Sequence, residues 1–454
     1  MANFNSINPF TGKTISELPE LSQEDIQVRL NKAAEVYQIY RKSEYSYRSE
    51  RLYKVAEILR ADSKELAEII TNEMGKAITE SVAEVLKCAW VCEYYAEHAE
   101  EFLSSKDVST DASLSYVKYE PLGTILAVMP WNFPLWQVFR FAAPALMAGN
   151  IVLLKHASNV QLSAKKIEEV FLNAGFEDGV FQNLAVKSGA VAAIIENSVV
   201  KAITLTGSEF AGASVAEVAG KNIKKCVLEL GGNNAFVVLN DADIEKAVEV
   251  SLIARLLNAG QSCIAAKRFI LEEEIHDEFI RKLKEKILVY KVGDPTLDET
   301  KMGPLSSSQA VDALDMQVQK SIELGANLIY GGQSDGAKYE PAILLDVKPG
   351  MPAFDEELFG PVYAVTKVKS KEEALELSNQ SEFGLGLNLF TRSKETADFF
   401  IENAQEGSVF VNSMVKSDPR LPFGGVKKSG YGRELSVEGI REFVNVKTVY
   451  MEDI

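Results

Sequence analysis

The chain has 454 residues, too many for a single hydrophobic core, so we expect two or three domains. Its formal net charge of −17 excludes a chain-wide basic surface of the kind that binds nucleic acid or anionic lipid. Four cysteines are too few for the disulfide framework of a secreted protein this large, so we expect a reducing cytoplasmic location. No apolar run approaches the ~18 residues of a membrane span.

The first hundred residues predict helices. Ser22 can cap a segment whose apolar residues, from Ile26 to Tyr40, recur near helical spacing. From about residue 124, short apolar runs alternate with helical stretches, which predicts parallel strands joined by crossover helices, with ligand-binding turns at the carboxyl ends of the strands. These runs are TILAVMP, IVLLKH, VFQNLAV, KAITLTG and KKCVLEL.

A second block follows Gly232, with a strand at FVVL and a helix from about Ile244 to Leu257, and it predicts a second α/β domain. Its later strands are YEPAILLDV, VYAVTKV, LNLFT and SVFVN. The segments SLSYVKYEP and FVNVKTVYM alternate like strands outside both blocks and could pair as a projecting ribbon. Because another subunit usually covers such a ribbon, we expect a homodimer or homotetramer.

Histidines are scarce, which restricts the catalytic chemistry. The chain has only three, and no G-x-S-x-G turn follows a strand, so a serine hydrolase is poorly supported. Cys88, Cys92 and His98 share one helical region, but two cysteines one turn apart in an apolar stretch are typical of a core. We therefore expect no metal site.

Three separate residues could together perform acyl chemistry. Cys263 lies in LNAGQSC, where Gly260 breaks the preceding helix and places the thiol in a turn. Glu229 ends an apolar strand, where a carboxylate can act as a general base. Asn132 in MPWNFP offers a neutral amide that, with the Cys263 backbone amide, could stabilise an oxyanion. In isolation, a buried structural cysteine and a solvated strand-end glutamate are the commoner interpretations.

Six motifs together resemble those of the aldehyde dehydrogenase superfamily, and they follow that family's order. They are MPWNFP, LTGSEFAG, LELGG, GQSC, EELFGPV and PFGGVKKSGYGRE. The separation of Glu229 and Cys263 also agrees with that of the general base and the nucleophile in the family's hydrolytic members. The resemblance implies an α/β fold with a Rossmann-type cofactor domain, an α/β catalytic domain and a small β oligomerisation ribbon. We expect the cofactor domain at 1–107 and 122–231, the catalytic domain at 232–436 and the ribbon at 108–121 and 437–454.

The resemblance also implies a mechanism. Cys263 attacks an aldehyde, Asn132 and the Cys263 amide stabilise the oxyanion, and a nicotinamide cofactor accepts hydride. Water activated by Glu229 then hydrolyses the thioester.

A cofactor site is expected at the turn LTGSEFAG. Gly207 and Ser208 follow a strand and precede a helix, so free N–H groups could face a pyrophosphate. By resemblance, the other nicotinamide and adenosine contacts are Trp131, Asn132, Leu230, Glu357 and Phe359.

The choice of cofactor depends on LLKHASN. Lys155 is followed three residues later by Ser158, where the common family pattern has a glutamate. A glutamate would repel a 2′-phosphate, whereas Ser158 can donate to it and Lys155 can pair with it. We therefore predict that NADP is preferred and that NAD remains possible.

The expected substrate is a small aldehyde with a distal carboxylate. Arg140 lies on the helix after MPWNFP, and an arginine in a narrow tunnel is costly unless an anion meets it. Together with HASN and MVKSDPRLPFGG, Arg140 resembles the succinate semialdehyde dehydrogenase subgroup, particularly its bacterial and cyanobacterial members. The resemblance implies that this arginine binds the substrate carboxylate. The alternative is a salt bridge between Arg140 and a neighbouring acid. Ser417 and Arg420 could assist from the loop before PFGG, or could have simple surface roles.

Alternative functions remain open. Within the family they are a broader dehydrogenase for glutarate semialdehyde or medium-chain aldehydes and, less expected, a coenzyme A-acylating enzyme, which generally lacks the carboxylate of Glu229. A catalytically silent cofactor-binding protein is the alternative of a different class, and the joint presence of Cys263, Glu229 and Asn132 argues against it. Ile264 follows Cys263 and no second cysteine lies two residues on, so a local disulfide switch is not expected.

Overall fold

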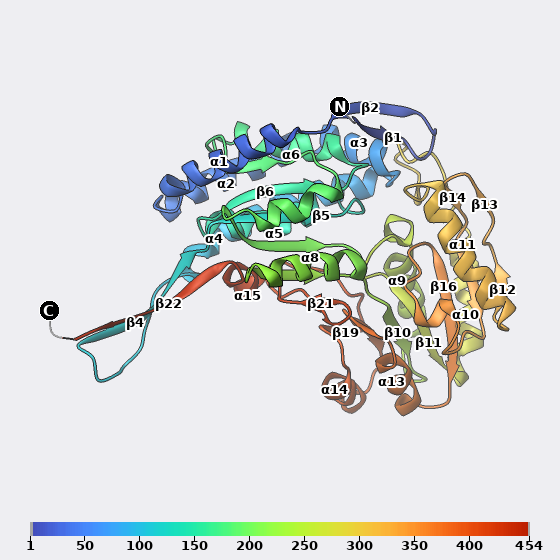
Figure 1. Ribbon diagram of the computed structural model, residues 1–454. Coiled ribbons are helices and arrows are strands. Elements are labelled where there is room, and N and C mark those ends of the chain that lie inside the picture. The colour runs from blue at the N-terminus through green and yellow to red at the C-terminus, as the bar shows by residue number, and fades with distance from the viewer. Residues whose placement is uncertain (1–2, 453–454) are drawn as a thin grey trace.

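The computed structural model describes residues 3–452, in which two large β-sheets carry helices and a thin ribbon projects from one end (Figure 1). The predicted α/β class is confirmed by these sheets, whose central strands run parallel. No helix within residues 3–452 is long and apolar enough to cross a membrane.

The N-terminal region differs in part from the helices predicted for the first hundred residues. It begins with an antiparallel hairpin of β1 (Asn3–Ile7) and β2 (Thr14–Pro19). Asn8 holds the turn, because its side chain accepts hydrogen bonds from two following backbone amides. The predicted helices come only after this hairpin. They are α1 (Gln23–Tyr40), α2 (Tyr45–Ala61), α3 (Ser63–Met74) and α4 (Ile78–Phe102).

The predicted cap of α1 is confirmed. Ser22 Oγ accepts a hydrogen bond from the Asp25 amide at 3.1 Å, and the Asp25 carboxylate accepts one from the Ser22 amide at 3.0 Å. Ile26, Leu30 and Tyr40 are buried, so α1 packs the face that its spacing predicted.

The first sheet has six strands, and all five strands predicted after residue 124 belong to it. In sheet order they are β21 (Gly430–Tyr431), β9 (Lys225–Glu229), β8 (Val200–Thr206), β5 (Thr124–Met129), β6 (Ile151–His156) and β7 (Phe181–Asn183). The helices among them are α5 (Trp136–Met147), α6 (Gln161–Asn173), the 3₁₀ helix Ser188–Ala190, α7 (Val191–Glu196) and α8 (Glu209–Lys221). Strands β5 to β9 run parallel and are largely buried, which explains their near-continuous apolar runs. Their carboxyl ends form one edge of the sheet.

The second sheet has seven strands and contains the later predicted strands. In order they are β12 (Asn327–Tyr330), β15 (Ala342–Leu345), β16 (Val362–Val368), β11 (Ala266–Glu272), β10 (Asn234–Val238), β18 (Leu387–Phe390) and β19 (Val409–Val411). Its helices are α9 (Ile244–Leu256), α10 (Glu273–Ile287), α11 (Ser308–Glu323), α12 (Pro352–Asp355), α13 (Lys371–Asn379) and α14 (Lys394–Asn403). Short strand pairs join β13 (Ser334–Asp335) to β14 (Lys338–Tyr339) and β17 (Phe383–Gly384) to β20 (Val426–Lys427). Apolar clusters pack on both faces of this sheet.

The projecting ribbon is the predicted pairing of two distant segments. Strand β22 (Val444–Met451), which follows α15 (Ser436–Arg441), runs antiparallel to β4 (Leu114–Pro121), and β3 (Lys106–Asp107) pairs with the other side of β4. That pairing is confirmed, and Figure 1 shows the ribbon extending from the body. The domain limits and the ribbon's role in oligomerisation stay predictions.

A buried ion pair anchors the segment that leads into α5. The Glu84 carboxylate of α4 accepts hydrogen bonds from the Leu135 and Trp136 amides, each at 2.9 Å, and pairs with the ammonium of Lys76. That ammonium lies 3.8 Å from the centroid of the Phe133 ring. Both charged side chains are almost fully buried, so each needs the opposite charge of the other to offset the cost of its removal from water.

We predict that Glu84→Ala lowers the free energy of unfolding by about 3–5 kcal/mol, because it leaves the Lys76 charge buried and unpaired. Urea unfolding measures the change. Glu93→Ala is the matched control on the same helix, and its exposed pair with Arg60 should cost less than about 1 kcal/mol. Equal losses in the two variants would contradict the anchoring role of Glu84.

Candidate functional site

The thiol of Cys263 lies after a sharp reversal of the chain. A short 3₁₀ segment, Leu257–Gly260, follows α9, and its Asn258 and Ala259 have φ of 54° and 51°. Gly260 continues the reversal with φ of 77°, and a Cβ there would lie 2.4 Å from the Gly360 carbonyl oxygen. The glycine predicted to break the helix is therefore required both by conformation and by space.

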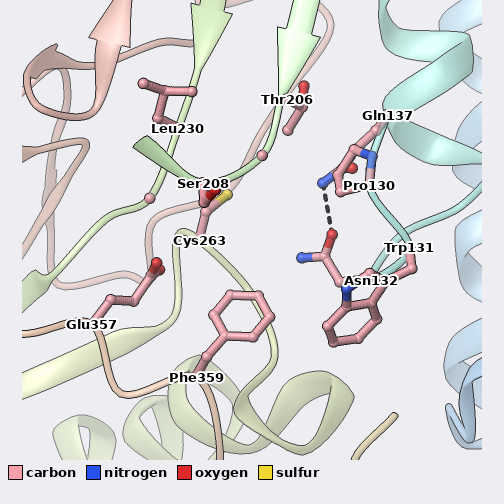
Figure 2. Close-up of a pocket in the computed structure, with 12 residues that line it drawn as sticks. Pro130, Trp131, Asn132, Gln137, Thr206, Ser208, Leu230, Cys263, Glu357 and Phe359 are labelled. Atoms are coloured by element: carbon pink, nitrogen blue, oxygen red, sulfur yellow. Dashed lines mark hydrogen bonds between the residues drawn. The ribbon is translucent and has the colours of Figure 1, made fainter. Parts of the chain in front are cut away.

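Hydrogen bonds join the Cys263 loop to the Asn132 loop. Asn132 Nδ2 donates to the Gln261 carbonyl at 3.0 Å, and Asn258 Nδ2 donates to the Asn132 carbonyl at 2.8 Å. Gln137 Nε2 donates to Asn132 Oδ1 at 3.1 Å, as the dashed line in Figure 2 shows. With its oxygen engaged, the Asn132 amide keeps its nitrogen for donation, and its second N–H is available to an oxyanion.

His156, the last residue of β6, fixes the loop that contains Asn132 through a hydrogen bond to its backbone. Its Nε2 donates to the Pro134 carbonyl at 2.8 Å, while its Nδ1 accepts from the Ala157 amide at 2.9 Å. Burial lowers the pKa of His156 to about 4, so the ring is neutral near pH 7. The histidine is therefore a structural support for the loop.

Lys267 stabilises the Cys263 loop through its backbone carbonyls. Its Nζ donates to the carbonyls of Ser262 and Cys263, each at 2.8 Å, and pairs with Glu357 at 3.0 Å. Glu357 also accepts from the Gly232 amide at 3.1 Å. Nothing in the sequence singled out Lys267, which is the second residue of the buried strand β11.

A cavity of about 230 Å³ opens beside Cys263 at the carboxyl ends of β8 and β9 (Figure 2). The Trp131 and Phe359 rings meet edge to face in its wall, 5.9 Å between centroids. Seven predicted cofactor residues line it. They are Trp131, Asn132, Gly207, Ser208, Leu230, Glu357 and Phe359.

The turn after β8 differs from its prediction in one detail. The Gly207 N–H is not free, because it donates to the Glu229 carbonyl at 3.0 Å and extends the pairing of β8 with β9 by one residue. Ser208 caps α8 through a bond of 3.3 Å from the Ala211 amide. An anion would therefore meet the start of α8 from Ser208 onward.

Lys155, near the end of β6, and Ser158, just after that strand, lie at the same sheet edge but outside the lining of this cavity. The Lys155 side chain is buried, which lowers the pKa of its ammonium, and it forms no ion pair within residues 3–452. Ser158 is exposed. Their contact with a cofactor stays a prediction.

Glu229 ends β9 as predicted, and its carboxylate is 2% exposed. Neither carboxylate oxygen has a hydrogen-bond partner among residues 3–452, and a Cβ on Gly424 would lie 2.7 Å from Oε1, so the group rests against the PFGG loop. Burial and the nearby Glu434 raise the pKa of Glu229 well above its usual value. Glu229 does not line the cavity beside Cys263, although the adjacent Leu230 does.

Arg140 forms the salt bridge that sequence analysis held as the alternative. Its guanidinium pairs with the buried carboxylate of Glu434, donates to Thr206 Oγ1 at 3.4 Å and lies 4.5 Å from the Phe423 ring centroid. Burial raises the pKa of Glu434, and Arg140 opposes that rise. Glu434 is the last residue of the motif PFGGVKKSGYGRE, and no role was predicted for it.

A second cavity, of about 160 Å³, adjoins the first through Cys263 and Gln137. Arg140 and Ser417 line it as predicted for the substrate side. Arg420 does not, because its exposed guanidinium makes two hydrogen bonds to Asp418, at 2.8 and 2.7 Å. The other lining residues are Glu80, Ala83, Glu84, Lys87, Phe133, Trp136, Leu257, Ser262, Ile264, Met414, Lys416 and Phe423.

Comparisons with known proteins agree with this arrangement. The family model described as the aldehyde dehydrogenase family matches residues 2–449. A probable succinate-semialdehyde dehydrogenase [NADP(+)] of Synechocystis is 48% identical and covers 98% of this chain and 99% of its own. A succinate semialdehyde dehydrogenase [NAD(P)+] of Escherichia coli is 46% identical and covers 99% and 98%. The crystal structure of succinic semialdehyde dehydrogenase from Streptococcus pyogenes with NADP+ has a TM-score of 0.97 at 41% identity, covering 99% of this chain and 100% of that one.

Burial raises the pKa of the Cys263 thiol to about 11, which predicts how the free enzyme reacts with iodoacetamide. Because only the thiolate reacts, inactivation without cofactor should accelerate about tenfold per pH unit up to about pH 10. Peptide mass spectrometry identifies the alkylated residue, and Cys263→Ser is the control, since Cys88, Cys92 and Cys226 are buried. A rate that levels off below about pH 8 would contradict the raised pKa.

Proposed function

This chain belongs to the aldehyde dehydrogenase family, and we propose that it oxidises succinate semialdehyde to succinate, with NADP preferred over NAD as the oxidant. The observation that carries the proposal is the position of Cys263, which borders both cavities. A thiol at that point can meet an aldehyde from one side and an oxidant from the other. Several cations line the second cavity, which suits an aldehyde with an anionic end.

Cys263 is the nucleophile in this proposal. Its sulfur attacks the aldehyde carbon and forms a thiohemiacetal, whose oxygen gains negative charge. The free N–H of Asn132 and the Cys263 backbone amide stabilise that oxygen. Because Gln137 and Gln261 already fix the Asn132 amide, little reorganisation is needed when the charge develops.

The first cavity has the shape and chemistry to hold the nicotinamide cofactor. Trp131, Leu230 and Phe359 supply apolar walls, and Ser208 at the start of α8 supplies a site for the pyrophosphate. When bound, the cofactor accepts a hydride from the substrate, which leaves a thioester on Cys263.

We assign the recognition of the 2′-phosphate to Lys155 and Ser158. The buried ammonium of Lys155 has no carboxylate partner within residues 3–452, and the hydroxyl of Ser158 is exposed beside it in sequence. A phosphate would therefore gain a charge-assisted contact without displacing an existing ion pair. The name of the Synechocystis relative gives NADP(+), and that of the E. coli relative gives NAD(P)+.

Glu229 is the general base that activates water for hydrolysis of the thioester. Burial and the equally buried Glu434 raise the pKa of this carboxyl group, which favours its protonated form in the free enzyme. For hydrolysis the proton must leave and the side chain must turn from Gly424 toward Cys263. The positive charge of Arg140 favours the ionised form.

We also propose how the parts of the chain divide these tasks. Residues 1–107 and 122–231 form the cofactor-binding domain and 232–436 the catalytic domain, while 108–121 and 437–454 form the ribbon; residues 1–2 and 453–454 of these ranges lie outside the part of the chain that the structure describes. Val446 of the ribbon is 60% exposed and Tyr450 is 47% exposed, apolar area that a homodimer or homotetramer would cover. The four free cysteines agree with work in the cytoplasm.

The proposal predicts rapid NADPH formation from succinate semialdehyde, measured by absorbance. Turnover with NADP should exceed turnover with NAD, and kcat/KM should be higher for succinate semialdehyde than for glutarate semialdehyde or butanal. Ser158→Glu should lower the NADP/NAD ratio of kcat/KM by at least about tenfold, because it places a negative charge beside the 2′-phosphate. Cys263→Ala is the inactive control.

Two outcomes would overturn separate parts of the proposal. A wild-type enzyme that oxidises butanal as well as succinate semialdehyde would remove the substrate assignment. An unchanged NADP/NAD ratio in Ser158→Glu would remove the cofactor assignment.

A further inference from the structure

The turn between β6 and α6 carries Ser158, to which the proposed function assigns recognition of the 2′-phosphate. It covers residues 157–160, and the Val160 amide closes it by donating to the Ala157 carbonyl at 3.3 Å. Ser158 is a central residue of this turn and is exposed. A hydroxyl on a loose turn would lose conformational freedom on meeting a phosphate, so its contribution to binding depends on how firmly the turn is held.

Gln161 holds this turn from the first position of α6. Its Nε2 donates to the Ala157 carbonyl at 2.9 Å and to the His156 carbonyl at 3.4 Å. From the other side, His156 Nδ1 accepts from the Ala157 amide at 2.9 Å. Both polar backbone groups of the residue before Ser158 are therefore engaged, and its carbonyl is directed toward a buried amide.

The burial of Gln161 is costly. The residue is 1% exposed, and its Oε1 has no hydrogen-bond partner among residues 3–452. An apolar side chain of similar volume would avoid the cost of burying an unpaired amide oxygen. Packing alone therefore does not account for a glutamine here, whereas the bonds from its Nε2 to the turn give the amide a role that an apolar residue could not fill.

The start of α6 offers little to a phosphate, because a carboxylate already occupies it. Glu73 of α3 accepts from the Leu162 and Ser163 amides at 2.8 and 2.9 Å, and from Ser163 Oγ at 2.7 Å. These two amides are thus engaged within the protein. Recognition of the 2′-phosphate then depends on the side chains of Ser158 and Lys155, and on the direction in which the turn holds Ser158.

We infer that Gln161 is a positioning residue that sets the preference for NADP over NAD, because its amide holds the turn from which Ser158 meets the 2′-phosphate. This inference rests on the proposed function and on its assignment of Ser158. NAD has a hydroxyl in place of that phosphate, so it gains less from a fixed Ser158. Loss of the Gln161 amide would also release the His156 carbonyl, and a carbonyl oxygen that turned toward the phosphate would repel it.

The test compares Gln161→Leu with Gln182→Leu. Gln182 of β7, a strand of the same sheet, is a matched control because it is 3% exposed and its Nε2 also donates to two backbone carbonyls, at 2.9 and 3.4 Å. Isothermal titration calorimetry without aldehyde gives the dissociation constants of NADP and NAD. Steady-state kinetics with succinate semialdehyde gives KM and kcat for each cofactor.

We expect Gln161→Leu to weaken NADP binding about tenfold and NAD binding less than about threefold, with KM following the dissociation constant and kcat within about twofold of wild type. Gln182→Leu should keep the NADP/NAD ratio of dissociation constants within about twofold, even where its loss of stability in urea is as large. Gln161→Met gives the same comparison if the leucine variant does not fold.

The outcomes separate this inference from the proposed function. A ratio that is unchanged in Ser158→Glu contradicts the proposed role of Ser158 itself. A ratio that changes in Ser158→Glu but is kept in both Gln161 variants contradicts only the assignment of Gln161. An equal loss of NADP and NAD binding in the Gln161 variants, or an equal change of the ratio in Gln182→Leu, makes Gln161 a structural residue and also overturns the inference.

Discussion

The site depends on the hydrogen bonds that join two loops far apart in sequence. Asn132 and the Cys263 loop exchange bonds in both directions, through Gln261 and Asn258. Each loop is fixed again from outside, the first by Glu84 and His156 and the second by Lys267. The proposed nucleophile and the amide that would stabilise its oxyanion are therefore held together before a substrate arrives, the condition under which electrostatic stabilisation is most effective.

The second feature of the site is a group of buried charges formed by Glu229, Glu434 and Arg140. Glu229 and Glu434 are both buried. The guanidinium of Arg140 pairs with Glu434, and its positive charge lowers the pKa of Glu229. Because the two acids are close together and buried, the protonated form of Glu229, the proposed general base, is favoured.

Much of the fold was visible in the sequence because buried parallel strands leave near-continuous apolar runs, such as IVLLKH in β6. The N-terminal hairpin was missed, since its strands alternate only weakly and bury few apolar side chains. Motifs singled out Cys263, Asn132 and most of the residues that line the cavity beside the thiol. They could not identify Glu434 as the partner of Arg140, because that contact joins residues distant in the chain. They also could not identify Lys267, whose bonds to the Ser262 and Cys263 carbonyls depend on the conformation of the turn before β11. The sequence left open whether Arg420 contacts the substrate or has a surface role, and in the structure its guanidinium is bound to Asp418.

The central claim is that Cys263 forms a thioester that Glu229 helps to hydrolyse. The most direct measurement is mass spectrometry of Glu229→Gln after brief exposure to succinate semialdehyde and NADP. The account predicts one succinyl group on the peptide that contains Cys263, persisting in the variant and hydrolysed rapidly in the wild-type enzyme. A variant that forms NADPH at the wild-type rate and carries no acyl group on Cys263 would contradict it.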